Sequence, residues 1–166
     1  GGLRPHEFFE KASKIARLGS GSACRSVFPY LAVWGKHPEI PLSSNEYAVP
    51  FHETVHPIFK TYKDAILIVS SDEKSVSSRA GHALMEGNPY AESRYKQAET
   101  NLSDLIAAMK NGNIEKYGEI VENEALTLHG LMMNSNPSFI LLHPNTLHII
   151  NQIRAFRHDT NIPLCF

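Results

Sequence analysis

Apolar side chains recur with a helical period along most of this chain. In four stretches an apolar residue returns every three or four positions, which places the apolar side chains on one face and the charged ones on another. The pattern predicts four long helices, which cover residues 5–17, 91–111, 114–134 and 144–158. One or two further turns of helix are predicted over residues 81–86. Gly112 directly follows the second of them, where a glycine commonly ends a helix.

Extended segments are expected between these helices. Residues 32–34 and 47–51 look extended, and turn-forming Pro, Ser and Asn residues lie between them. Residues 64–70 contain the run Ala-Ile-Leu-Ile-Val, whose β-branched composition is typical of a buried strand. A last apolar segment, residues 162–166, predicts the beginning of another strand. These elements predict an α+β fold in which helices pack on an antiparallel or mixed sheet.

Composition and charge narrow the class of protein. The chain has 166 residues, with 16 Lys and Arg against 17 Asp and Glu, so no excess of positive charge points to nucleic acid or to an anionic membrane surface. No run of about 18 apolar residues predicts a membrane span. The two cysteines, Cys24 and Cys165, lack the spacing of a zinc site or a disulfide framework, which favours a reducing, cytoplasmic location.

The stretch most informative about chemistry is residues 17–26, Arg-Leu-Gly-Ser-Gly-Ser-Ala-Cys-Arg-Ser. Its glycines would let backbone amides approach an anion, and Ser20 and Ser22 would add hydroxyl donors. A helix beginning at about Ala23 would aim its free amides at the same point, and Arg25 would offer a two-pronged donor for carboxylate or phosphate. A surface loop that merely caps a helix is the alternative. The spacing matches neither the Walker loop nor the dinucleotide-binding fingerprint.

Two stretches resemble a known family. Residues 13–26 resemble the second signature motif of diphosphomevalonate decarboxylases, which belong to the superfamily of galactose, homoserine, mevalonate and phosphomevalonate (GHMP) kinases. Residues 76–82, Val-Ser-Ser-Arg-Ala-Gly-His, resemble the family segment that helps to bind the substrate diphosphate. The resemblance spans essentially the whole chain, with further agreement in residues 88–90, 122–133 and 153–157.

This resemblance implies a reaction and roles for five residues. Family members use ATP and Mg²⁺ to convert mevalonate 5-diphosphate into isopentenyl diphosphate, with loss of phosphate and carbon dioxide, and the full enzymes are usually homodimers. By similarity, Arg25 is the catalytic residue that pairs with the substrate carboxylate. Ser20 and Ser22 would bind substrate oxygens or the diphosphate, and Ser78 and Arg79 would hold the diphosphate tail.

The resemblance also implies a division of the chain. Residues 1–70 would be the end of an N-terminal lobe that carries the substrate motif, and residues 71–166 a C-terminal helical α+β lobe. The alternative is one compact unit, which is the default for a chain of this length. The family's nucleotide-binding motif would precede Gly1, and its essential aspartate would follow Phe166. We therefore expect this chain to be part of a larger enzyme and to be inactive by itself, with the nucleotide-binding residues unknown.

Two other functions stay open at the level of sequence. A related mevalonate or phosphomevalonate kinase would phosphorylate its substrate without decarboxylation. A non-catalytic anion-binding fragment would instead pair with other chains through the sheet edge at residues 162–166.

The helix predicted over residues 114–134 carries titratable side chains that could take part in catalysis. Glu122 and Glu124 stand two positions apart and so face different sides, which argues against an acid–base pair. His129 lies on the apolar face and is interpreted as a core histidine.

Overall fold

The computed structural model describes residues 4–52, 54–70, 83 and 85–166. It divides into two compact units, Gly1–Thr54 and Val55–Phe166. This division falls earlier in the chain than the boundary after residue 70 that the sequence predicted. The assignment of residues 1–70 and 71–166 to two lobes of an enzyme stays a prediction.

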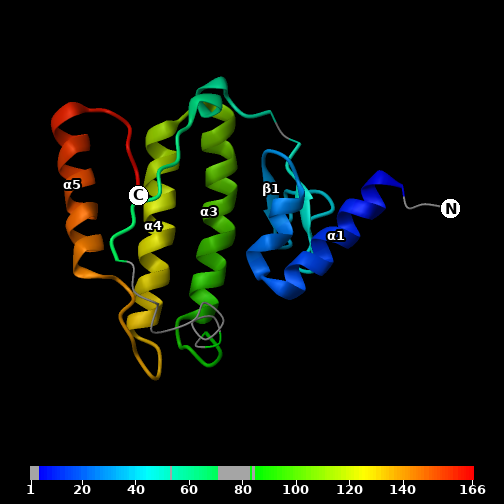
Figure 1. The fold of residues 1–166 in the computed structure, drawn as a ribbon, viewed down its shortest axis with the longest axis horizontal. Helices are drawn as coiled ribbons and strands as arrows, with labels where there is room; N and C mark the ends of the chain where they lie inside the picture. The colour runs from blue at the N-terminus through cyan, green and yellow to red at the C-terminus, as the bar shows by residue number, and fades with distance from the viewer. Residues whose placement is uncertain (1–3, 53, 71–82, 84) are drawn as a thin grey trace. The chain divides into compact units, whose positions relative to one another are not determined.

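The first unit combines one long helix with a short one and a two-stranded sheet (Figure 1). Helix α1 (Pro5–Gly19) has a proline in its first turn, and the side chain of Glu7 accepts hydrogen bonds from Arg4, which precedes the helix. Strands β1 (Ala32–Trp34) and β2 (Ala48–Pro50) pair antiparallel, with Val33 opposite Val49. The helix and both extended segments predicted for this part of the chain are confirmed.

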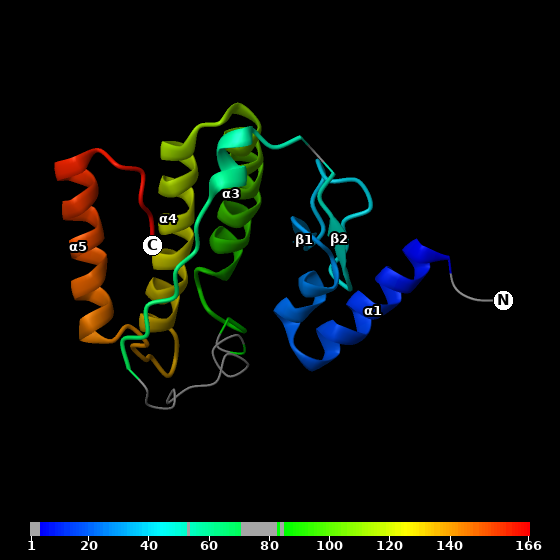
Figure 2. The ribbon, with the colours of Figure 1, turned by 45° about the horizontal axis from the view of Figure 1, so that its top comes forward.

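The second unit is built on three helices that lie side by side with α4 in the middle (Figures 1 and 2). They are α3 (Ala91–Asn111), α4 (Ile114–Met133) and α5 (Pro144–Thr160), and a short 3-10 helix, η2 (Pro57–Thr61), precedes them in the chain. The three long helices were predicted from their periodicity and are confirmed. Their buried apolar side chains form the core of this unit, namely Ile106, Ala108, Ile120, Leu131 and Ile150.

The turn between α3 and α4 requires a glycine. Gly112 has a φ of 73°, in the left-handed region, and its N–H donates to the Ala108 carbonyl to close α3. A Cβ at this position would lie 2.6 Å from Nδ1 of His56. Conformation and space therefore both exclude a side chain, and Asn113 then caps α4 by accepting from the N–H of Lys116.

Two predicted strands are absent from the structure. Residues 64–70 have no regular secondary structure and pair with no described strand, and their side chains are not buried: Ile66 is 88% and Ile68 is 83% exposed. Residues 162–166 are likewise unpaired. Both predictions were wrong for the same reason, since a strand forms only where a neighbouring segment accepts and donates its backbone hydrogen bonds.

The α+β class is confirmed in a helix-rich form. The sheet of the described residues is the two-stranded antiparallel one in the first unit. The turn of helix predicted over residues 81–86 lies mostly outside the described residues. Among those described, no helix is both long and apolar enough to cross a membrane.

Candidate anion-binding site

The glycine- and serine-rich motif forms a tight connection between two helices. The N–H of Ser20 donates to the Ala16 carbonyl at 3.0 Å and closes α1. The carbonyl of Ser20 accepts from the N–H of Ala23, also at 3.0 Å, and opens the 3-10 helix η1 (Gly21–Val27). One residue thus separates the two helices, which fixes the direction of the motif relative to α1.

An aromatic ring lies directly against Gly21. A Cβ on Gly21 would lie 3.1 Å from the indole ring of Trp34, closer than a relaxed contact allows. The ring is itself held, since its Nε1–H donates to the Asn45 carbonyl at 3.0 Å. By contrast, a Cβ on Gly19 would meet no atom within 4 Å. Gly21 therefore permits the close approach of the motif to strand β1.

The three predicted site residues of this unit are all exposed on the motif. Ser20, Ser22 and Arg25 reach solvent, and no side-chain hydrogen bond or ion pair ties them to another described residue. Between them lies Cys24, which is fully buried. The buried Cys24 side chain thus holds the backbone of the motif against the rest of the unit, while two hydroxyl groups and one guanidinium face solvent. This is an arrangement that can receive a carboxylate or phosphate group.

The helix in this motif differs from the one expected. A helix was expected to begin at about Ala23 and to direct its free amides at the anion. The structure shows a 3-10 helix that begins at Gly21 and has only 7 residues, with Arg25 in its last turn. So short a helix contributes little dipole, because the aligned peptide groups are few. The donors available to an anion are therefore the side chains.

Cys24 is enclosed in the first unit. The Cys24 side chain has no exposed surface, so it contributes to packing. Burial raises the pKa of the Cys24 thiol above its ordinary value, although the nearby charge of Arg25 works in the opposite direction. A protonated, enclosed thiol is a poor nucleophile, so we assign Cys24 no chemical role.

The other two predicted site residues, Ser78 and Arg79, lie outside the described residues. That they share a site with Ser20, Ser22 and Arg25 stays a prediction. Within the described part of the chain, no group of three or more His, Cys, Asp or Glu side chains could hold a metal ion.

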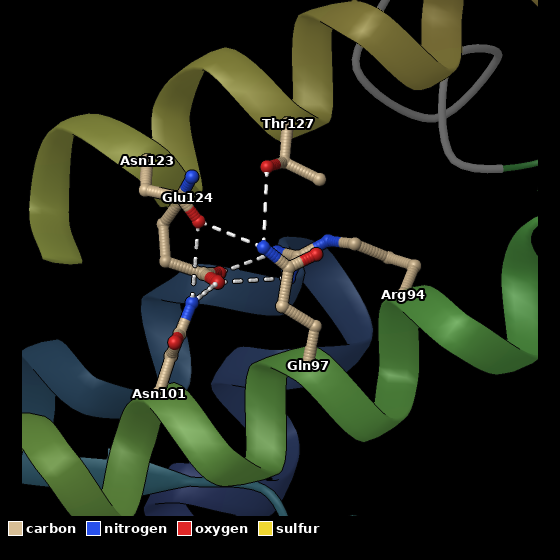
Figure 3. Close-up of polar contacts among 6 residues, drawn as sticks. All are labelled: Arg94, Gln97, Asn101, Asn123, Glu124 and Thr127. Carbon is tan, nitrogen blue, oxygen red and sulfur yellow. Dashed lines mark hydrogen bonds and ion pairs between the residues drawn. The ribbon is translucent and has the colours of Figure 1, made fainter.

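A polar cluster that the sequence analysis missed joins α3 to α4 (Figure 3). Nη1 of Arg94 donates to Oε1 of Glu124 at 2.9 Å, and Nδ2 of Asn101 donates to the same oxygen at 2.7 Å. Burial tends to raise the pKa of Glu124, but the hydrogen bonds from Arg94 and Asn101 and the charge of Arg94 outweigh it and lower the pKa. The signal in the sequence was polar residues at helical spacing on α3, namely Arg94, Gln97 and Asn101.

Glu122 points to the other side of α4, as the two-residue spacing predicted. Its side chain is 9% exposed, and its carboxylate pairs with Arg157 of α5, whose Nη1 also donates to the Leu164 carbonyl at 2.7 Å. Glu122 and Glu124 thus have different basic partners on different helices. The prediction that they do not form an acid–base pair is confirmed.

Comparison with known proteins identifies the family. Residues 65–164 match the profile of the mevalonate 5-diphosphate decarboxylase C-terminal domain. This chain belongs to that family. The resemblance predicted from residues 13–26 and 76–82 is thereby confirmed.

The similarity of this chain to mevalonate diphosphate decarboxylases also includes its first unit. A diphosphomevalonate decarboxylase from Debaryomyces hansenii is 28% identical over 151 residues, which cover 90% of this chain and 37% of that protein. A crystal structure of a mevalonate diphosphate decarboxylase from Legionella pneumophila is 28% identical with a TM-score of 0.75, covering 95% of this chain and 47% of that one.

A third relative is a solved complex, described as MDDEF with MVAPP, AMPPCP and magnesium. It is 28% identical, has a TM-score of 0.78, and is matched over 95% of this chain and 47% of its own length. These likenesses confirm the expected fold class. In each case this chain spans less than half the length of the relative it matches.

Proposed function

We propose that this chain is part of a diphosphomevalonate decarboxylase, which uses ATP to convert mevalonate 5-diphosphate into isopentenyl diphosphate, phosphate and carbon dioxide. The observation that carries the proposal is the motif at residues 19–26. In a chain of this family, Arg25 is exposed and unpaired among the described residues, next to the exposed hydroxyl groups of Ser20 and Ser22.

Arg25 acts on the substrate carboxylate in this proposal. A guanidinium can donate two parallel hydrogen bonds to a carboxylate, which fixes the carbon–carbon bond that breaks as carbon dioxide leaves. Such preorganised donors lower the barrier most when they are held in place before the substrate arrives. The closed turn at Ser20 and the burial of Cys24 supply that rigidity.

Ser20 and Ser22 would donate to oxygens of the substrate, and Ser78 and Arg79 to its terminal diphosphate. The carbonyl of Ser20 is occupied within η1, whereas its hydroxyl makes no capping hydrogen bond and is free to face a ligand. Hydroxyl and guanidinium groups together match the oxygen-rich substrate, which carries one carboxylate and one diphosphate.

ATP and Mg²⁺ are proposed as cofactors of the whole enzyme. The related complex that contains AMPPCP, magnesium and MVAPP supports this assignment. The described residues hold no cluster of metal-ligating side chains, so we assign no residue of this chain to Mg²⁺. A cytoplasmic location and a homodimeric state complete the proposal.

Product analysis tests this function. The full-length protein that carries this chain is incubated with ATP, Mg²⁺ and mevalonate 5-diphosphate labelled in its carboxylate. We expect labelled carbon dioxide and isopentenyl diphosphate in equal amounts. ATP consumption with the label retained in a phosphorylated product would instead identify a kinase without decarboxylation, and no turnover would contradict an enzymatic role for the proteins that contain this chain.

A further inference from the structure

A single buried hydroxyl connects three elements of the first unit. Ser13 lies on α1 and has no exposed surface. Its Oγ–H donates to the carbonyl of Cys24 in η1 at 2.8 Å, and its Oγ accepts from the N–H of Ala48 in β2 at 2.9 Å. The hydroxyl group thus uses both of its hydrogen-bonding roles on backbone groups that are far away in the sequence.

The carbonyl that Ser13 binds belongs to the peptide group between Cys24 and Arg25. A peptide group is planar, so holding its oxygen also fixes the direction of its N–H and of the Arg25 Cα to which it is joined. Arg25 itself is exposed, and its side chain makes no hydrogen bond or ion pair with another described residue. The starting point of its side chain is therefore set by the backbone, and Ser13 holds that backbone.

The frame to which Ser13 ties the peptide is rigid as well. On the same helix, Nε of Arg17 donates to the Glu46 carbonyl at 2.7 Å, and Lys14 forms an ion pair with the Glu46 side chain. Helix α1 is thus joined to the segment that leads into β2 through several polar contacts. Of these, the Ser13 contact is the one that also reaches η1.

We infer that Ser13 is a positioning residue for the decarboxylation, because its hydroxyl fixes the Cys24–Arg25 peptide and so directs Arg25 to the substrate carboxylate. This inference rests on the proposed function. Loss of the hydroxyl leaves the buried Cys24 carbonyl and Ala48 N–H without their partner, and the peptide turns to recover a hydrogen bond. A displacement of about 1 Å at a group that orients the substrate can lower a rate by about 100-fold.

The test is a set of double-mutant cycles on kcat/KM for carbon dioxide release by the full-length protein. Ser13→Ala, Arg25→Ala and the double variant form the first cycle. Ser135→Ala supplies the matched control in the second unit. Ser135 is also buried, and its Oγ lies 2.8 Å from the backbone carbonyls of both Met132 and Pro137, which share its single O–H donor. Thermal melts confirm that each variant unfolds cooperatively.

Ser13→Ala is expected to lower kcat/KM about 10- to 100-fold, mainly through kcat, while Arg25 is present. In the Arg25→Ala background the same change is expected to alter kcat/KM by no more than about twofold, because Ser13 then has no guanidinium to position. Ser135→Ala should have equal effects in both backgrounds. This difference separates positioning from a loss of stability alone.

Equal effects of Ser13→Ala in both backgrounds, or no effect in either, would overturn the inference while leaving the proposed function standing. A wild-type protein that releases no carbon dioxide would overturn both. Should Ser13→Ala fail to fold, Ser13→Thr and Ser13→Val give the comparison at constant shape. The threonine variant should then retain more activity than the valine variant by about tenfold, and equal activities would overturn the inference.

Discussion

Arg94 and Glu124 face each other across the contact between α3 and α4, where Nη1 and Nη2 of Arg94 donate to the two carboxylate oxygens of Glu124 (Figure 3). The side chains are 16% and 30% exposed, so neither is deep in the core and neither is freely solvated. Asn101 donates to the same carboxylate. This pair fixes how the two longest helices of the second unit pack against each other.

Arg94→Ala should lower the free energy of unfolding by about 1–3 kcal/mol, because it leaves the carboxylate of Glu124 half-buried without its charged partner. Urea denaturation at pH 7 measures this change. The control is Lys116→Ala, which breaks the exposed pair with Glu119 within α4 and should cost no more than about 0.5 kcal/mol. Equal losses in the two variants would show that the Arg94 pair contributes no more than a surface contact.

His129 should make the second unit sensitive to acid. Its Nδ1 is buried without a partner among the described residues, and burial lowers the pKa of His129 below its ordinary value of about 6.5. The folded protein therefore favours the neutral ring, and the unfolded chain takes up the proton at a higher pH. The contribution of the neutral His129 ring to the free energy of unfolding is full above about pH 6.5 and is lost as the pH falls toward the lowered pKa.

His129→Gln should consequently lose less stability than wild type between pH 7.5 and pH 5.5, because glutamine does not titrate. Unfolding free energies at both pH values measure the difference. His148→Gln, at an exposed position on α5, should lose as much stability as wild type over the same interval. If the unfolding free energy of His129→Gln fell with pH as steeply as that of wild type, burial of this histidine would have no effect on the pH dependence of stability.

Gly21 and Gly19 offer a matched pair in the candidate site. Gly21→Ala should displace the Trp34 ring and lower the free energy of unfolding by about 1–3 kcal/mol, since the new Cβ would lie 3.1 Å from the indole. Gly19→Ala meets open space and should be tolerated. Trp34 is the only tryptophan of the sequence, so fluorescence of the 166-residue chain reports the change directly. An unchanged emission spectrum in Gly21→Ala would contradict the close contact.

Local signals predicted the helices well. The periodicity of residues 91–111 and the glycine at 112 give the bounds of α3, because both the apolar face and the left-handed ending are encoded within a few residues. The strand expected at residues 64–70 was wrong, because pairing depends on a distant segment that composition cannot identify. The same limit applies to residues 162–166.

In the candidate site, too, local features could be predicted from the sequence and contacts between distant segments could not. Ser20, Ser22 and Arg25 could be proposed from the motif, since exposed donors beside glycines have a recognisable spacing. The contact of Ser13 with the Cys24 carbonyl could not, because it depends on how α1 packs on η1 and β2. The Arg94–Glu124 pair likewise depends on the register of two helices.

The proposed function depends most on the assignment of Arg25 to the substrate carboxylate. Its most direct test is kcat/KM for carbon dioxide release by the full-length protein, compared among wild type, Arg25→Ala and Lys11→Ala, which removes another exposed cation of the same unit. We expect a decrease of about 100- to 1000-fold for Arg25→Ala. We expect a value within about twofold of wild type for Lys11→Ala. Equal activity of the two variants would contradict the assignment of Arg25 to the substrate carboxylate.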